Sequence, residues 1–412
     1  MSLTVQQKRQ ILSKLEEIVN KRFYDPSFER KKWSDLVAQH QPEIVDSSPQ
    51  EAFEAAVTSL LSELHSSGTG FLAPNNKISA RNAISASFRR IPDTPDGDRW
   101  VFQDVQPGGV AERAGVRPAD VLLSIDGKPA VSAEEPNFEM GKRVPIVISR
   151  NGDRKPTHVE LSIPGPKYRS NPYSEPQSAV AKMISSNIGY LKISLFPGMI
   201  GIDFAKLLDE LFQGPLETAQ RLVVDLRGNP GGGLGSIRLM SYLTPDKRPI
   251  GYSLDRKCTE EGRCGPDGLP HFGRIPKSKL GILPLAMRYH KKECVVIETE
   301  GRGPRKFHGK VVVMVNEHCA GAAEMVAQFA KENRLATLVG MKTSGRLNAH
   351  CTFKLGFGYR LMIPVAAYIT WNGSRVEGHG VEPDVPVDWS FRDAQEGRDL
   401  QLEQGVEIVR AL

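Results

Sequence analysis

The most informative segment of this chain reads Asp225-Leu226-Arg227-Gly228-Asn229-Pro230-Gly231-Gly232-Gly233. It follows an apolar run and precedes a run with helical periodicity at 235–243, so the sequence predicts a strand, a glycine-rich loop and a helix. Glycines let the backbone approach a ligand, and N–H groups near a helix N-terminus can face a developing negative charge. A tight strand-to-helix turn without any ligand is the alternative interpretation of such a loop.

Strands and helices alternate on both sides of this loop. Apolar strands separated by helices indicate a mainly parallel sheet that is covered on both faces, and therefore an α/β core. The predicted strands are 188–193, 221–226, 310–316 and 336–339, and the predicted helices are 202–212, 235–243 and 322–333. Residues 245–309 contain three cysteines and many Gly, Pro and Lys residues, and we expect a long irregular insertion that flanks the site.

Upstream of the core, residues 99–164 show short strands around one short helix. The run PGGVAERAGVRPADVLLSIDGKPA at 107–130 closely resembles a PDZ domain of the kind found in bacterial proteases. Such modules add an extended peptide as a strand and hold its terminal carboxylate with backbone N–H groups. Before this module, apolar residues recur at helical spacing from Val5 to Leu64. We therefore divide the chain into an N-terminal helical domain (1–75), a PDZ-like domain (76–166) and an α/β core (167–412).

Composition excludes several classes of protein. The net charge of +6 is spread along the chain, so nucleic acid is not an expected partner, and no apolar run approaches the roughly 18 residues of a membrane span. Five cysteines are too few and too scattered for a disulfide scaffold. Cys258 and Cys264 could bridge a loop, whereas zinc is disfavoured because their spacing is not C-x₂-C and only His271 lies close downstream. No metal or organic cofactor is expected.

Four core segments together resemble the C-terminal processing (tail-specific) proteases, whose core is of the crotonase-like α/β type. The glycine loop resembles the family's D-L-R-x-N-x-G-G signature. The other three are VVVMVNEHCAGAAE at 311–324, LVGMKTSGRLNAH at 338–350 and GHGVEPDV at 378–385. With the PDZ-like run they cover most of residues 100–390 in the family's order. The resemblance implies peptide hydrolysis, an oxyanion hole at Gly231 and Gly232, and an extracytoplasmic location, although no signal peptide is visible at the N-terminus.

The expected catalytic side chains are absent in this register. The family's nucleophilic serine falls on Gly321 and its general-base lysine on Arg346, which keeps the family's interval of 25 positions. The glutamine that orients the lysine falls on His350, and the histidine of the H-T-G-F segment in Ser-His relatives falls on Gly68. Glycine cannot attack a carbonyl, and arginine stays protonated at any working pH.

Three hypotheses remain. In the first, the chain is a peptidase in which Cys319, near a helix N-terminus, attacks the scissile carbonyl. His350 or His318 is then the base, Arg346 supplies positive charge, and the N–H groups of Gly231, Gly232 and Ala322 hold the oxyanion. Substitutes for the thiol are Ser344 and Ser66-Ser67.

In the second hypothesis, the chain is a pseudoprotease that binds peptide tails without cleaving them. In the third, it uses another constellation, for which His379, Tyr359 and Asp225 are candidates, each with a structural role preferred. Under every hypothesis the expected partner is a protein or peptide, recruited through its C-terminal tail.

Overall fold

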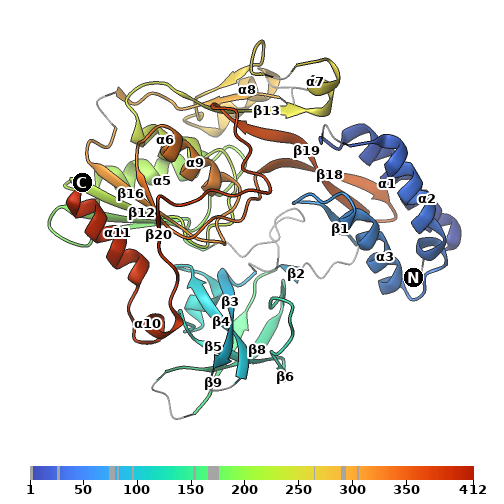
Figure 1. The fold of residues 1–412 in the computed structure, drawn as a ribbon, viewed down its shortest axis with the longest axis horizontal. Coiled ribbons are helices and arrows are strands. Elements are labelled where there is room, and N and C mark those ends of the chain that lie inside the picture. The colour runs from blue at the N-terminus through green and yellow to red at the C-terminus, as the bar shows by residue number, and fades with distance from the viewer. Residues whose placement is uncertain are drawn as a thin grey trace.

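The computed structural model describes residues 3–25, 28–73, 79–80, 83–94, 97–151, 155–165, 176–263, 265–288, 294–303 and 306–412. Figure 1 shows the N-terminal helices beside a long pair of strands at one end, the PDZ-like module below, and the α/β core with the C-terminal helix at the other end. Residues 168–177 are rich in Pro, Ser and Asn, which predicts a linker, but most of them lie outside the described residues, as does Cys264.

The sheet at the centre of the core is mainly parallel, as predicted. Its strand order is β10-β11-β12-β16-β17-β20, with β10 antiparallel at the edge and the other neighbours parallel. The strands are β10 (Ala179–Met183), β11 (Ile188–Ile193), β12 (Arg221–Asp225), β16 (Lys310–Val315), β17 (Thr337–Gly340) and β20 (Val385–Pro386). Nearly every residue of β12 and β16 is buried, because both faces of the sheet are covered.

Helices cover the two faces of this sheet. One face packs against α5 (Ile202–Gln213), α6 (Ser236–Leu243) and α9 (Ala322–Glu332), whose apolar stripes share one core with the strands. The opposite face packs against α11 (Leu400–Ala411), which follows the short α10 (Phe391–Gln395). The α/β layering predicted from alternating strands and helices is therefore confirmed.

A second sheet corrects one prediction. The described part of segment 245–309 is not irregular, because β13 (Pro249–Asp255) lies inside a mixed sheet, antiparallel to both of its neighbours, β15 (Val296–Glu298) and β19 (Tyr359–Thr370). Five successive residues of β13 are buried. The strand is stabilised by partners far away in the sequence, and the short apolar pattern of β13 does not indicate these partners. The remaining elements of this sheet and segment are β1 (Gly70–Leu72), β18 (Asn348–Gly356), β14 (His271–Phe272), α7 (Arg256–Glu260), a 3₁₀ turn (Lys279–Gly281) and α8 (Ile282–Arg288).

The N-terminal helices pack on the β18–β19 hairpin. These helices are α1 (Val5–Arg22), α2 (Arg30–Asp46) and α3 (Gln50–Ser62), and they share a core with residues 355–367. Phe53 and Tyr359 meet edge to face at 5.7 Å in this core. The helical region therefore completes its core with strands of the C-terminal half. Among the described residues, no helix combines the length and apolar composition needed to cross a bilayer.

The PDZ-like module is a sheet of order β3-β4-β5-β8-β9 that wraps one short helix. Its elements are β2 (Ser79–Ala80), β3 (Ala86–Thr94), β4 (Gly97–Val105), α4 (Val110–Arg113), β5 (Val121–Ile125), β6 (Lys128–Pro129), β7 (Phe138–Glu139), β8 (Arg143–Ser149) and β9 (Thr157–Ser162). The module contacts the core directly at the glycine loop, where Gln106 Nε2 donates to Arg227 O at 3.2 Å. Near by, Asn316 Nδ2 donates to Asp104 Oδ2 at 2.9 Å.

Candidate functional site

The structure brings the glycine loop and the 319–322 turn together. Both follow parallel neighbours, β12 and β16, so both leave the same edge of the sheet. A Cβ placed on Gly231 would lie 2.7 Å from Ala320 O and 3.0 Å from Ala322 N, which means that the two backbones are in contact. Gly231 has φ +97°, so only glycine suits this close approach.

The backbone donors at this contact differ in their availability. The N–H of Gly231 donates to Asn229 Oδ1 at 2.8 Å, and this bond occupies the group that the family resemblance assigns to the oxyanion hole. The N–H groups of Gly232 and Ala322 have no protein acceptor among the described residues. Ala322 is also the first residue of α9, where the helix dipole favours negative charge. The N–H groups of Gly232 and Ala322 are therefore the ones that can donate to an anionic or carbonyl oxygen.

A buried ion pair holds the glycine loop on the sheet. Asp225, at the end of β12, accepts hydrogen bonds from Arg227 Nη2 at 2.8 Å and from Tyr190 OH at 2.7 Å, and Lys192 Nζ lies 3.3 Å away. Burial would raise the pKa of Asp225, but the charges of Arg227 and Lys192 and their hydrogen bonds hold it well below its usual range. The structural role preferred for Asp225 is confirmed: the carboxylate pairs with Arg227.

Gly321 keeps the geometry of a nucleophile turn without the side chain. Its φ of +54° and ψ of −119° form a conformation that L side chains rarely adopt, at a sharp strand-to-helix turn. A Cβ at this position would find ordinary contacts, the nearest being Gly231 Cα at 3.6 Å. Space for a Cβ therefore exists at Gly321, the position to which the family resemblance assigns the serine.

Glu324 ties this turn to the segment that carries Arg346. Its buried carboxylate accepts from Thr343 Oγ1 at 2.5 Å, Gly345 N at 2.7 Å, Arg346 N at 2.9 Å and Gly321 N at 3.1 Å. Gly321 N also donates to Arg346 O at 3.0 Å. Sequence reasoning missed this residue as a site component, although its place three residues after the helix N-cap is a capping signal that could have found it.

Cys319 does not have the surroundings of a nucleophile. Its side chain is 0% exposed, Sγ donates to Leu226 O at 3.0 Å, and Sγ accepts from Asn316 N at 3.3 Å. Burial raises the pKa of this thiol well above its ordinary value, so the neutral form is favoured. The helix N-terminus that suggested a thiolate is outweighed by the apolar core in which the sulfur lies.

The two histidines proposed as bases point to different places. The His318 Nε2 atom is 3.2 Å from Gln103 Oε1 of the PDZ-like module, so this ring lies at the contact between the module and the core. His350 is exposed on β18, and a Cβ on Gly68 would lie 3.5 Å from its Nδ1 atom. His350 thus adjoins Gly68, the position to which the family resemblance assigns the histidine of Ser-His relatives. Arg346, four positions before His350, is also exposed.

The remaining candidates have structural partners. Ser344 Oγ donates to Cys319 O at 2.6 Å, and Ser67 is held through its backbone, which donates to Glu377 Oε1 at 3.2 Å. Tyr359 OH donates to Glu54 Oε1 at 3.0 Å in the core below the N-terminal helices. His379 is exposed in a turn, with Nδ1 2.9 Å from Glu377 O. None of these contacts directs a nucleophile or a base at Gly321.

A cavity of about 700 Å³ lies between the PDZ-like module and the core, away from Gly321. Its wall mixes apolar and charged residues, and the charged ones include Arg117 and Arg150 from the module and Asp225, Arg227 and Asp399 from the core. No residue of the Gly321 turn or of the Arg346 segment lines it. Arg150, Arg227 and Asp399 already form ion pairs, with Asp120, Asp225 and Arg227 respectively, and the cavity lies away from the Gly321 turn, so we keep the candidate site at the Gly231–Ala322 contact.

Comparison with known proteins identifies the family. Residues 187–387 match Peptidase family S41 and residues 101–136 match a PDZ domain. The chain is 23% identical over 423 residues to a carboxyl-terminal-processing protease of Synechocystis sp., covering 99% of this chain and 88% of that protein. It is 24% identical over 345 residues to the carboxy-terminal processing protease CtpA of Bacillus subtilis, covering 81% of this chain and 64% of that protein.

Solved structures share the fold over nearly the whole chain. The photosystem II D1 C-terminal processing protease is similar with a TM-score of 0.57 at 19% identity, covering 97% of this chain and 96% of that one. Mature CPAF in complex with lactacystin is similar with a TM-score of 0.58 at 14% identity, covering 100% and 98%. With its PDZ domain, its S41 match and the ordered motifs of its core, this chain belongs to the C-terminal processing protease family.

Proposed function

We propose that this protein binds the C-terminal tails of polypeptides without hydrolysing them. The observation that carries the proposal is Gly321, which has the backbone of a nucleophile turn and no side chain. The neighbouring thiol of Cys319 is buried and bonded to a backbone carbonyl, so it offers no substitute. Peptidase activity through Cys319, with His318 or His350 as base, would require the thiol to leave its core position.

Features that suit a bound carboxylate remain at the Gly231–Ala322 contact. The N–H groups of Gly232 and Ala322 can donate to an oxygen. Arg346 is exposed, and its backbone carbonyl accepts a hydrogen bond from Gly321 N, which holds Arg346 beside the Gly321 turn. A guanidinium presents two parallel donors to a carboxylate and keeps its charge at any working pH. Replacing a lysine base by arginine therefore exchanges proton transfer for anion binding.

The proposal extends to recruitment and location. A PDZ domain adds an extended peptide to a sheet edge, so the module is expected to deliver the tail to the Gly231–Ala322 contact. The expected partners are polypeptides, and neither nucleic acid nor a metal takes part in tail binding. Family resemblance favours an extracytoplasmic location, which fractionation of the native host would test.

Binding is tested with fluorescent peptides that differ only in a free or amidated C-terminus. We expect the peptide with the free carboxylate to bind more tightly, and Arg346→Gln to weaken its binding by about 10- to 100-fold, because a charge-assisted bond contributes about 1.5–3 kcal/mol. Lys342→Gln is the matched control, since Lys342 is an exposed cation in the same loop that pairs with Glu382. Equal affinity of the two peptides for the wild-type protein would contradict carboxylate capture.

Hydrolysis is tested by rebuilding the dyad. We expect the wild-type protein to leave an unfolded substrate intact, and the Gly321→Ser, Arg346→Lys double variant to cleave it slowly. The serine fits because its Cβ meets nothing closer than 3.6 Å, although the positive φ costs about 1–3 kcal/mol. Cleavage by the wild-type protein, abolished in Cys319→Ala, would refute the proposal and restore the thiol peptidase.

A further inference from the structure

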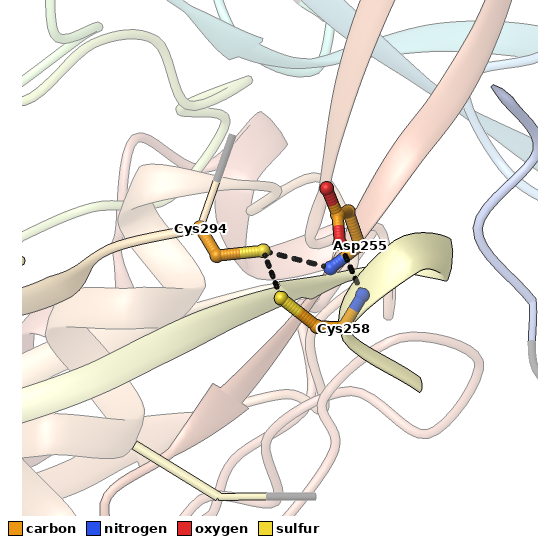
Figure 2. A group of neighbouring side chains, drawn as sticks. All are labelled: Asp255, Cys258 and Cys294. Carbon is orange, nitrogen blue, oxygen red and sulfur yellow. Dashed lines mark hydrogen bonds between the residues drawn. The ribbon is translucent and has the colours of Figure 1, made fainter. Parts of the chain in front are cut away.

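A cluster of two thiols and one carboxylate lies in the 245–309 segment, away from the Gly321 turn. Figure 2 shows Asp255, Cys258 and Cys294 pointing toward one another. Asp255 ends β13, Cys258 lies in α7, and Cys294 comes two residues before β15. The carboxylate oxygen and the two sulfurs all lie within 4.8 Å of one another, and the two sulfurs are 3.1 Å apart.

We propose that Asp255, Cys258 and Cys294 form a binding site for a zinc ion. Ligand atoms at about 2.0–2.3 Å from one tetrahedral zinc are about 3.3–3.8 Å apart; the two sulfurs, at 3.1 Å, lie slightly closer than this, and no pair of the three ligand atoms is more than 4.8 Å apart. Shifts of less than about 1 Å would therefore complete the geometry. A fourth position is left for water, as in other zinc sites with three protein ligands.

The frame of the site is rigid. β13 and β15 are paired, with Tyr252 opposite Val296. Ser253 N donates to Val295 O at 3.0 Å, and Val295 N donates to Ser253 Oγ at 3.1 Å. These bonds fix Cys294 beside the end of β13, so a metal would meet ligands that are already positioned.

Backbone donors already support the proposed ligands. Cys258 N donates to Asp255 Oδ1 at 2.7 Å, and Asp255 N donates to Cys294 Sγ at 3.1 Å. Hydrogen bonds of this kind orient metal ligands and stabilise the anionic sulfur. Two thiolates, one carboxylate and one divalent cation leave a single negative charge, and both Arg22 and Arg263 interact electrostatically with the cluster.

A bound zinc ion would stabilise the small core around this cluster. The buried residues beneath the site are few, and two of them are the cysteines themselves: Tyr252, Leu254, Cys258, Leu269, Cys294 and Val296. A core this small supplies little stability, and small units commonly gain it from a metal. The mixed donor set favours zinc, because thiolates disfavour magnesium and calcium and the carboxylate disfavours copper(I). The C-x₂-C criterion missed the site because Cys294 lies 36 positions after Cys258.

Metal content and cobalt spectroscopy test the proposal on the full chain. We expect reduced protein, reconstituted with zinc and then dialysed, to retain one zinc per chain. Cobalt(II) added to the metal-free protein should give the thiolate charge-transfer and tetrahedral d–d absorption bands. Cys258→Ser and Cys294→Ser should each lose these bands, whereas Cys351→Ser, a thiol on exposed β18, should keep them.

Measurements of zinc affinity test whether Asp255 coordinates the ion or only lies beside it. Asp255→Asn should weaken zinc binding by about 10- to 100-fold or more in competition with a chromophoric chelator. Circular dichroism checks that each variant folds. The cobalt spectrum of the wild-type protein tests the proposal even if a variant does not fold. No retained zinc and no cobalt bands in the reduced wild-type protein would overturn the proposal. A Cys258–Cys294 disulfide in protein purified with zinc present would overturn it as well.

Discussion

The Asp225→Asn substitution removes the charge that anchors the glycine loop. The carboxylate of Asp225 is 1% exposed and accepts from Arg227 N at 2.9 Å as well as from the Arg227 side chain and Tyr190. Breaking a buried ion pair on one side costs about 3–5 kcal/mol. Arg227 keeps Asp399, at 2.7 Å, as a second carboxylate, so we expect the lower end, about 3 kcal/mol.

The pH dependence follows from the direction of the pKa shift. The pKa of Asp225 is lower in the folded state than in the unfolded state, so the stabilisation is fully present above about pH 4 and is lost as the pH falls toward the folded-state pKa. The difference in unfolding free energy between the wild-type protein and the variant should therefore shrink by about 1 kcal/mol from pH 6 to pH 3. Asparagine does not titrate, so the variant lacks this contribution.

Urea denaturation followed by circular dichroism measures both quantities, and thermal melts should show a loss of about 6–12 °C in Tm. Asp203→Asn is the matched control, since Asp203 is an exposed carboxylate in the first turn of α5 and should change stability by less than about 0.5 kcal/mol. A variant at Asp225 as stable as that control, or a stability difference that does not change with pH, would refute the reasoning.

Two further predictions concern the Gly321 turn and its neighbours. Glu324→Gln should destabilise the protein by about 2–4 kcal/mol, because the amide group replaces an acceptor oxygen and leaves buried N–H donors unpaired. The same exchange at an exposed position of α5, Glu210→Gln, is the control, and denaturant midpoints that match between the two variants would contradict this role. Under native conditions, a maleimide should modify Cys351 well before Cys319, because Cys319 is buried and the pKa of its thiol is raised. Peptide mapping measures the two rates of labelling. Labelling of Cys319 as fast as that of Cys351 would favour the thiol peptidase hypothesis again.

Local motifs determined the family and the register of the site. The glycine loop, the 311–324 segment and the PDZ-like run each combine backbone requirements with apolar periodicity, and such features are encoded by neighbouring residues. The interval between Gly321 and Arg346 therefore gave the hypothesis that these two positions replace the serine and the lysine of the family. The structure brings these positions together through Gly321 N and Arg346 O, as the register implies.

Side-chain surroundings could not be obtained in the same way. Cys319 precedes a helix, which suggested a reactive thiolate, yet Leu226 from a neighbouring strand end and the core beneath α9 enclose it. His318 turns to Gln103 of another module, more than 200 positions earlier in the chain. Both outcomes depend on contacts between segments far apart in sequence.

The sequence by itself determined the parallel α/β core and the PDZ-like module, because these follow from short patterns along the chain. Only the tertiary structure decided that Cys319 is buried, that β13 joins the sheet of β19, and that Cys294 meets Cys258. The physical reason is that periodicity tells which face of an element is covered, whereas the identity of the covering segment depends on how the whole chain packs.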